Sequence, residues 1–217
     1  MIQLNAVMLH SFSIMDDVHT EQHDNCVPCI VKHVREMMQD RGYKEEMSPP
    51  TPLPSLVDFG LLFQSDGQTE TTDMQHDLYG MSHQQQAVVL FIQQKVSIIV
   101  AREMLAYRQE HDIDRLIVVI TSSLAKATSQ VNTEFISSDV ELFLGAELSI
   151  NRNRNKLVPK MRVLSPAEAV KISTRERGGM TTFDKQYRYF RPPIGSVFEI
   201  ISNNGQTQPK VKYREVK

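Results

Sequence analysis

The chain has 217 residues, of which 41% are hydrophobic and 23% charged, with a net charge of −2. This composition excludes a disordered or collagen-like protein and predicts one large or two modest domains. No apolar run reaches the ~18 residues that a membrane-spanning helix needs, and two cysteines are too few for a disulfide scaffold, so we expect a reducing compartment.

The first part of the chain predicts alternating helices and strands. Apolar residues recur at three- and four-residue steps from Cys26 to Arg41, which is typical of an amphipathic helix that ends at Gly42. Residues 64–86 are polar and aperiodic and predict a surface loop. The elements that follow are a strand at 87–93, a helix at 96–111, a strand at 116–121, a helix from Ser122 or Ser123 to about Gln130, and a strand at 140–144. This order predicts a sheet with covering helices.

The last part of the chain predicts a small α+β unit. Residues 165–168 (SPAE) have the spacing of a capping box that opens a helix. Gly178 and Gly179 are expected to interrupt the regular structure. Two strand-like segments, residues 197–202 and 211–216, flank a turn signal at 203–205 and therefore predict a hairpin.

Charge divides the chain near residue 145. Residues 146–217 hold 15 Lys and Arg against 6 Asp and Glu, whereas residues 1–145 hold 9 basic and 20 acidic residues. The division predicts two units with different electrostatic partners. The basic unit suits nucleic acid or an acidic protein surface, and bare phosphate repels the acidic unit.

A Cys-x-Pro-Cys motif, Cys26 to Cys29, lies at the predicted start of the first helix. It allows three interpretations. A helix N-terminus stabilises a thiolate, as in thioredoxin-type redox pairs. His19, His23 and His33 lie near enough in the sequence to complete a tetrahedral zinc site. The third interpretation, two thiols without a chemical role, is favoured because no second cysteine pair supports either of the others.

Other signatures of catalysis are missing from the sequence. It contains no phosphate-binding loop, dinucleotide fingerprint or nucleophile elbow, so we expect no catalytic residue, no metal and no cofactor. Arg188 and Arg191 are interleaved with Tyr187, Tyr189 and Phe190, an arrangement that can stack on bases. The alternating, strand-like spacing of these aromatic residues is more typical of the edge of a core.

Several segments together suggest a family. Residues 34–43 (VREMMQDRGY) are followed by strand, helix and strand over residues 88–135, and residues 146–160 (AELSINRNRNKLVPK) contain a Leu-Val-Pro-Lys pattern. Residues 184–202 carry Arg-Tyr-Phe, and residues 212–216 end in Tyr-Arg-Glu-Val. In order and spacing these segments resemble the jaw subunit shared by nuclear RNA polymerases I, II and III, whose C-terminal module corresponds to a small subunit of the archaeal polymerase. The chain resembles a diverged paralogue or viral copy of that jaw subunit.

The resemblance implies a fold and a function. The expected fold is an α/β N-terminal jaw domain (residues 1–145, a small sheet with covering helices) and a small α+β C-terminal assembly domain (residues 146–217). The expected function is that of a non-catalytic subunit of a multisubunit DNA-dependent RNA polymerase in the nucleus, or in the nucleolus if it serves polymerase I. The implied partners are the largest polymerase subunit, other polymerase subunits and downstream DNA, with no membrane and no small-molecule substrate.

The resemblance also suggests which residues make these contacts. Lys126 is the candidate for DNA contact. The candidates for the subunit interface are Leu157, Pro159, Arg188, Tyr189, Phe190, Tyr213 and Arg214. For Leu157, Phe190 and Tyr213, a place in the core of the domain remains the alternative. The alternative function is a free-standing nucleic-acid-binding protein that uses its basic C-terminal domain.

Overall fold

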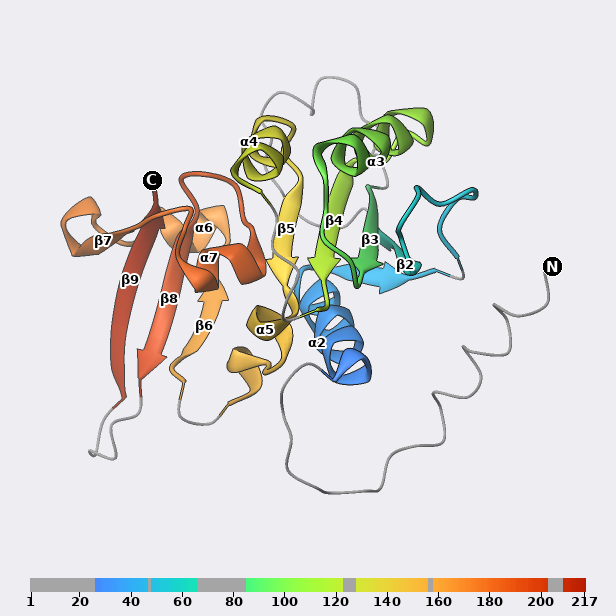
Figure 1. Cartoon of the computed structure of the whole chain (residues 1–217). Helices are drawn as coiled ribbons and strands as arrows, with labels where there is room; N and C mark the ends of the chain where they lie inside the picture. The colour runs from blue at the N-terminus through green and yellow to red at the C-terminus, as the bar shows by residue number, and fades with distance from the viewer. Residues whose placement is uncertain (1–25, 47, 66–84, 123–127, 156–157, 203–208) are drawn as a thin grey trace.

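The computed structural model describes residues 26–46, 48–65, 85–122, 128–155, 158–202 and 209–217. Two small β-sheets and several helices give the chain a mixed α/β content (Figure 1). We call the five-stranded sheet, of order β1-β2-β3-β4-β5, the first sheet, and the four-stranded sheet, of order β6-β8-β9-β7, the second sheet. Within these described residues, no helix is both long and apolar enough to cross a membrane.

The first sheet has a parallel part and an antiparallel edge. Strands β3 (Gln86–Ile92), β4 (Arg115–Ile120) and β5 (Glu141–Leu144) run parallel and are joined by helices α3 (Ile98–Glu110) and α4 (Ser129–Ser137). Strands β2 (Phe59–Ser65) and β1 (Tyr43–Glu45) add to it antiparallel. The central strands β3 and β4 are almost continuous runs of buried apolar residues, as is typical of parallel strands that are covered on both faces.

Helices cover both faces of the first sheet. Because side chains alternate along a strand, Val88 and Leu90 of β3 belong to the core under α3 and α4, whereas Val89 and Phe91 belong to the core under α2 (Val27–Asp40). Figure 1 shows α3 and α4 on one side of the sheet and α2 on the other. The first sheet is therefore the middle layer of three.

The second sheet has a smaller core. It is built from β6 (Lys160–Val163), β7 (Arg177–Met180), β8 (Val197–Ser202) and β9 (Lys210–Val216). Helix α7 (Lys185–Phe190) covers one face, where Tyr187 and Phe190 pack against Phe198. The short helix α6 (Pro166–Ala169) and the 3-10 helix η2 (Thr174–Glu176) connect β6 to β7.

A short connection joins the two sheets. It contains α5 (Gly145–Leu148) and the 3-10 helix η1 (Arg152–Arg154). Leu148 is buried in the core under α2, so α5 packs with the first sheet. The boundary that the charge division suggested, between residues 145 and 146, falls inside α5.

Most of the elements that the sequence predicted are confirmed. The helix predicted from Cys26 to Arg41 is α2, and the strands predicted at 87–93, 116–121 and 140–144 are β3, β4 and β5 within one residue at either end. The capping box of Ser165 and Glu168 opens α6. The predicted hairpin strands are β8 and β9, paired antiparallel, with the turn signal of residues 203–205 outside the described residues.

One prediction lies mostly outside the described residues: the helix expected from Ser122 or Ser123 to about Gln130. Within them, α4 begins at Ser129, where the Thr128 side chain caps it by accepting a hydrogen bond from the backbone of Val131, and it continues to Ser137. Two other predictions were wrong. Residues 178–179 lie within β7, where they pair with β9. The aromatic segment that looked strand-like forms α7, because the Asp184 side chain accepts a hydrogen bond from the Gln186 backbone and caps the helix.

Candidate interaction surface

Helix α7 lies where the two halves of the molecule meet. Tyr187 and Phe190 pack in the core of the second sheet, whereas Tyr189 packs against the core under α2. Arg191 ends the helix in the left-handed region, with φ 47°. We call the contacts that residues 184–191 make with α2, β5 and residues 147–154 the seam.

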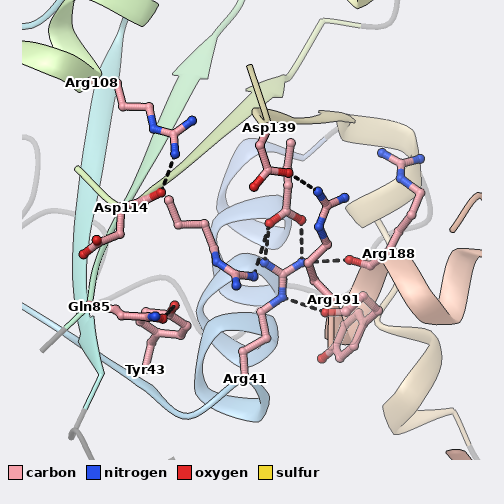
Figure 2. A network of polar contacts seen from close by, with 11 residues as sticks. Arg41, Tyr43, Gln85, Arg108, Asp114, Asp139, Arg188 and Arg191 are labelled. Carbon is pink, nitrogen blue, oxygen red and sulfur yellow. Dashed lines mark hydrogen bonds and ion pairs between the residues drawn. The ribbon is translucent and has the colours of Figure 1, made fainter. Parts of the chain in front are cut away.

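Arg41 is the central residue of the seam. Its side chain is 2% exposed and forms a two-pronged ion pair with Glu141, with Nη1–Oε1 at 3.1 Å and Nη2–Oε2 at 2.8 Å. It also donates from Nε to the carbonyl of Tyr189 at 2.8 Å and from Nη2 to that of Arg188 at 2.7 Å (Figure 2). The last carbonyls of a helix lack partners within the helix, so a side chain of α2's C-cap closes α7.

Glu141 is the anionic centre of this cluster. Its burial, with the side chain 5% exposed, would raise its pKa, but the charge of Arg41 and the hydrogen bonds from it act in the opposite direction. Arg115, whose Nη1 lies 3.7 Å from Oε1, and Arg191 also lower it. The net effect is a pKa below the usual range of a glutamate, so Glu141 is ionised at neutral pH.

A second group of polar contacts surrounds Tyr189. Its hydroxyl donates to Oδ2 of Asp40 at 2.8 Å and accepts from Nδ2 of Asn151 at 3.3 Å. Arg154 donates from Nη2 to the other oxygen of Asp40 at 2.8 Å, and Asn151 also donates to Glu36. Burial, followed by the hydrogen bond to Asp40, raises the pKa of Tyr189, so the phenol keeps its proton.

The arginines of α7 and its end complete the seam. Arg188 donates from Nη1 to Glu147 at 2.7 Å and lies over the ring of Phe143, 4.6 Å from its centre. Arg191 pairs with Asp139. Figure 2 shows Arg188 and Arg191 beside Arg41. Because Arg154 and Arg191 pair with acidic residues of the first 145, part of the charge division is neutralised within the chain.

The second sheet turns its other face away from α7. Phe198 pairs with Arg214 and Glu199 pairs with Tyr213, so Glu199 and Tyr213 lie on the face opposite the small core. Ile201 pairs with Val211 on that same face. Val211 is 43% exposed, and Ile201 and Tyr213 are half-buried. We call this surface the outer face.

An ion network borders the apolar side chains of the outer face. Arg162 of β6 donates from Nε to Glu199 at 2.7 Å and from Nη1 to Glu168 at 2.9 Å. The outer face therefore combines exposed apolar area with paired charges, a combination that occurs at the edge of protein–protein interfaces.

The predicted interface residues lie in three places. Arg188, Tyr189 and Phe190 lie together in α7 and already have partners within the chain. Tyr213 lies on the outer face, and exposed Pro159 precedes β6. Arg214 is exposed on the α7 side, with Nη1 3.8 Å from the Asp184 carboxylate. Leu157 and the predicted DNA contact, Lys126, are outside the described residues.

The zinc interpretation gains no further ligand from the described residues. They contain no group of three or more His, Cys, Asp or Glu that could hold a metal ion. Nδ1 of His33 donates to the carbonyl of Leu148 at 2.8 Å and joins α2 to α5. His19 and His23 are outside the described residues.

Sequence reasoning missed the central pair of the seam. Arg41 looks like an ordinary polar residue at the end of a helix, and its partner Glu141 lies 100 positions further along the chain. One signal was present. Glu141 begins an apolar strand at a position that alternation places on a buried face, beside Phe143, and a charge in such a position requires a partner.

The comparisons with known proteins give no family for this chain. No protein-family model matches it. No curated protein matches it either.

Proposed function

We propose that the chain is a non-catalytic subunit of a multisubunit DNA-dependent RNA polymerase, of the jaw type that the sequence resembles. The observation that carries the proposal is the fit of residues 146–160 and 212–216 to the assembly module of that family. The second of these segments lies in β9, which pairs with β8 on one side and β7 on the other. A specific sequence pattern thus lies at the centre of a small sheet.

The outer face is the docking surface that we assign to the largest polymerase subunit. Its support is the half-exposed apolar set of Ile201, Val211 and Tyr213 beside the paired charges of Arg162 and Glu199. In this proposal Arg188, Tyr189 and Phe190 do not touch the partner. Their contacts hold the second sheet against the first and so support the docking surface. Pro159 would flank the contact, whereas Arg214 lies on the α7 side and outside it.

The test is affinity purification of the tagged chain from the cells that make it, followed by identification of stoichiometric partners. We expect polymerase subunits to co-purify. Val211→Asp should remove them, because it puts a charge into the apolar part of the outer face. The matched control is Ile136→Asp, which is 73% exposed on α4, a helix that packs on the first sheet, whereas β9 belongs to the second; it should keep all partners.

Two other outcomes would count against the proposal. If both variants keep the same partners, the outer face is not the docking surface. If the wild-type chain has no stoichiometric partner and retards DNA at physiological salt, it is the free-standing nucleic-acid-binding protein instead. For the DNA contact itself, we expect Lys126→Ala in the assembled polymerase to lower the salt slope of downstream-DNA binding by about 0.9; an unchanged slope removes Lys126.

A further inference from the structure

Two cysteines lie three positions apart at the start of α2, at the opposite end of that helix from Arg41. Cys26 is the N-cap residue and Cys29 is the third residue of the helix. Helical geometry places Cα atoms three residues apart at about 5 Å, within the roughly 4.4–6.8 Å that a disulfide spans. The side chain of Cys26 also interacts with that of Cys29.

The two thiols differ in their surroundings. Cys26 is exposed, whereas Cys29 is partly buried. The hydrogen bond with Cys26, and then burial, raise the pKa of Cys29, so this residue holds its proton. Cys26 lies at the helix N-terminus, whose backbone dipole favours negative charge. An accessible sulfur thus lies beside a protected one.

We propose that Cys26 and Cys29 form a reversible dithiol–disulfide site that exchanges with small-molecule disulfides. The Cys26 thiolate attacks one sulfur of the small disulfide, forms a mixed disulfide and releases the first thiolate of the small molecule. Cys29 then loses its proton to solvent and attacks the Cys26 sulfur, which releases the second thiolate. The two protein thiols give up two electrons, and the small disulfide takes them up to become two thiols.

Within the described residues, nothing else gives the two cysteines a role. His33 lies one turn beyond Cys29, but its Nδ1 is bonded to Leu148, and no third metal ligand is at hand there. The seam and the outer face use neither cysteine. The site is therefore independent of the docking function proposed above.

The experiment counts free thiols on the purified full-length chain. The sequence contains two cysteines, so each count reports on this pair. The chain is equilibrated with glutathione buffers of rising oxidised fraction, quenched, alkylated and weighed by mass spectrometry. We expect both alkylation sites to disappear together in oxidised glutathione, with a monomer that has lost two hydrogens, and to return in reduced glutathione.

Single variants separate the roles of the two sulfurs. Cys29→Ser should stop at a stable glutathione adduct on Cys26, because no second thiol resolves it. Cys26→Ser should form its adduct more slowly, because Cys29 is less accessible. Oxidation of the wild-type chain should also slow amide hydrogen exchange in the first turn of α2, since the new bond fixes the N-cap.

The proposal would be overturned by any of three results. Both thiols could remain free, and therefore be alkylated, after equilibration with excess oxidised glutathione. They could end as two separate glutathione adducts or as disulfide-linked dimers. A zinc ion bound to the purified chain could protect both thiols from exchange. Each result concerns the isolated chain, so none of them bears on its association with a polymerase.

Discussion

At the scale of single residues, the seam depends on one buried cation. Arg41 serves two groups at once, the carboxylate of Glu141 and the carbonyls that end α7. Taking both charges out of water costs several kcal/mol, and the two-pronged geometry with further hydrogen bonds offsets that cost. Removal of one partner leaves the other charge buried without compensation.

Truncation of this arginine should therefore be costly. We expect Arg41→Ala to lower the free energy of unfolding by about 3–5 kcal/mol, because Glu141 and the two α7 carbonyls lose their donor. The measurement is urea unfolding followed by circular dichroism. The control is Arg35→Ala on the same helix: Arg35 pairs with Glu45 at 2.7 Å but is 47% exposed, so it should cost at most about 1 kcal/mol. Equal losses for the two variants would contradict a special role for Arg41.

Glu141 should make the stability of the fold decrease at acid pH. Its pKa in the folded chain is lower than in the unfolded chain, where about 4.3 is usual. The stabilisation is therefore complete above about pH 4.3 and is lost as the pH falls through the folded-state pKa. We expect the urea midpoint to fall in this acid range, and Glu141→Gln to be less stable at pH 7 but to lose less on acidification.

The control for this pH profile is a carboxylate on the surface. The backbone N–H of Ser165, followed by Arg162, lowers the pKa of Glu168 to about 2. Glu168 lies in the solvated capping box of α6, so solvent screens its contribution. Glu168→Gln should leave most of the acid dependence in place. If Glu141→Gln does not change how stability depends on pH in acid, another group causes that dependence.

At the scale of elements, the junction of β5 and α5 has no spare volume. A Cβ on Gly145 would lie 2.8 Å from Cδ1 of Ile30 and 3.2 Å from the carbonyl oxygen of Ile120. We expect Gly145→Ala to lower stability by about 1–3 kcal/mol, because α5 must move away from α2. Gly178→Ala in β7 is the control, since its nearest neighbours would lie at 3.7 Å; it should change stability by less than about 0.5 kcal/mol. Thermal unfolding of both variants measures the difference.

The elements that the sequence predicted are those whose signals are local. The periodic apolar residues of α2 and the β-branched run of β4 determine their structure within a few neighbouring positions. β1, which the sequence did not predict, has three residues and exists because Tyr43 pairs with Ser65. The aromatic residues of α7 alternate like a strand, but burial against two cores and the Asp184 cap favour a helix.

The candidate site was less predictable than the fold. The resemblance suggests that Arg188 and Tyr189 contact another protein. In the structure, both residues form hydrogen bonds within the chain, with Asp40, Glu147 and Arg41. These partners lie between 41 and 149 positions away. No sequence period reports such pairs. A strongly basic segment indicates that acidic partners exist, and it does not tell whether they belong to another molecule or to the same chain.

At the scale of the whole molecule, the charge division has an internal meaning. The acidic first part and the basic second part meet at the seam, where Asp40 and Asp139 accept from Arg154 and Arg191. These pairs are partly exposed, so each contributes little to the stability of the seam. The contacts of Arg41 contribute more, because they bind α7 to α2 through buried groups.

The two sheets should therefore unfold together. Hydrogen exchange in increasing urea should show amides of β4 and β8 opening with one free energy in the wild-type chain. Replacing both charges with apolar residues, Arg41→Met with Glu141→Leu, removes the buried ions without leaving one unpaired, so the first sheet should keep its stability. The same change removes the donor to the α7 carbonyls, and β8 amides should then lose protection at lower urea than β4 amides. If β4 and β8 still open together in this double variant, the remaining seam contacts, such as those of Arg188 with Glu147 and Tyr189 with Asp40, couple the halves, and Arg41 is dispensable for that coupling.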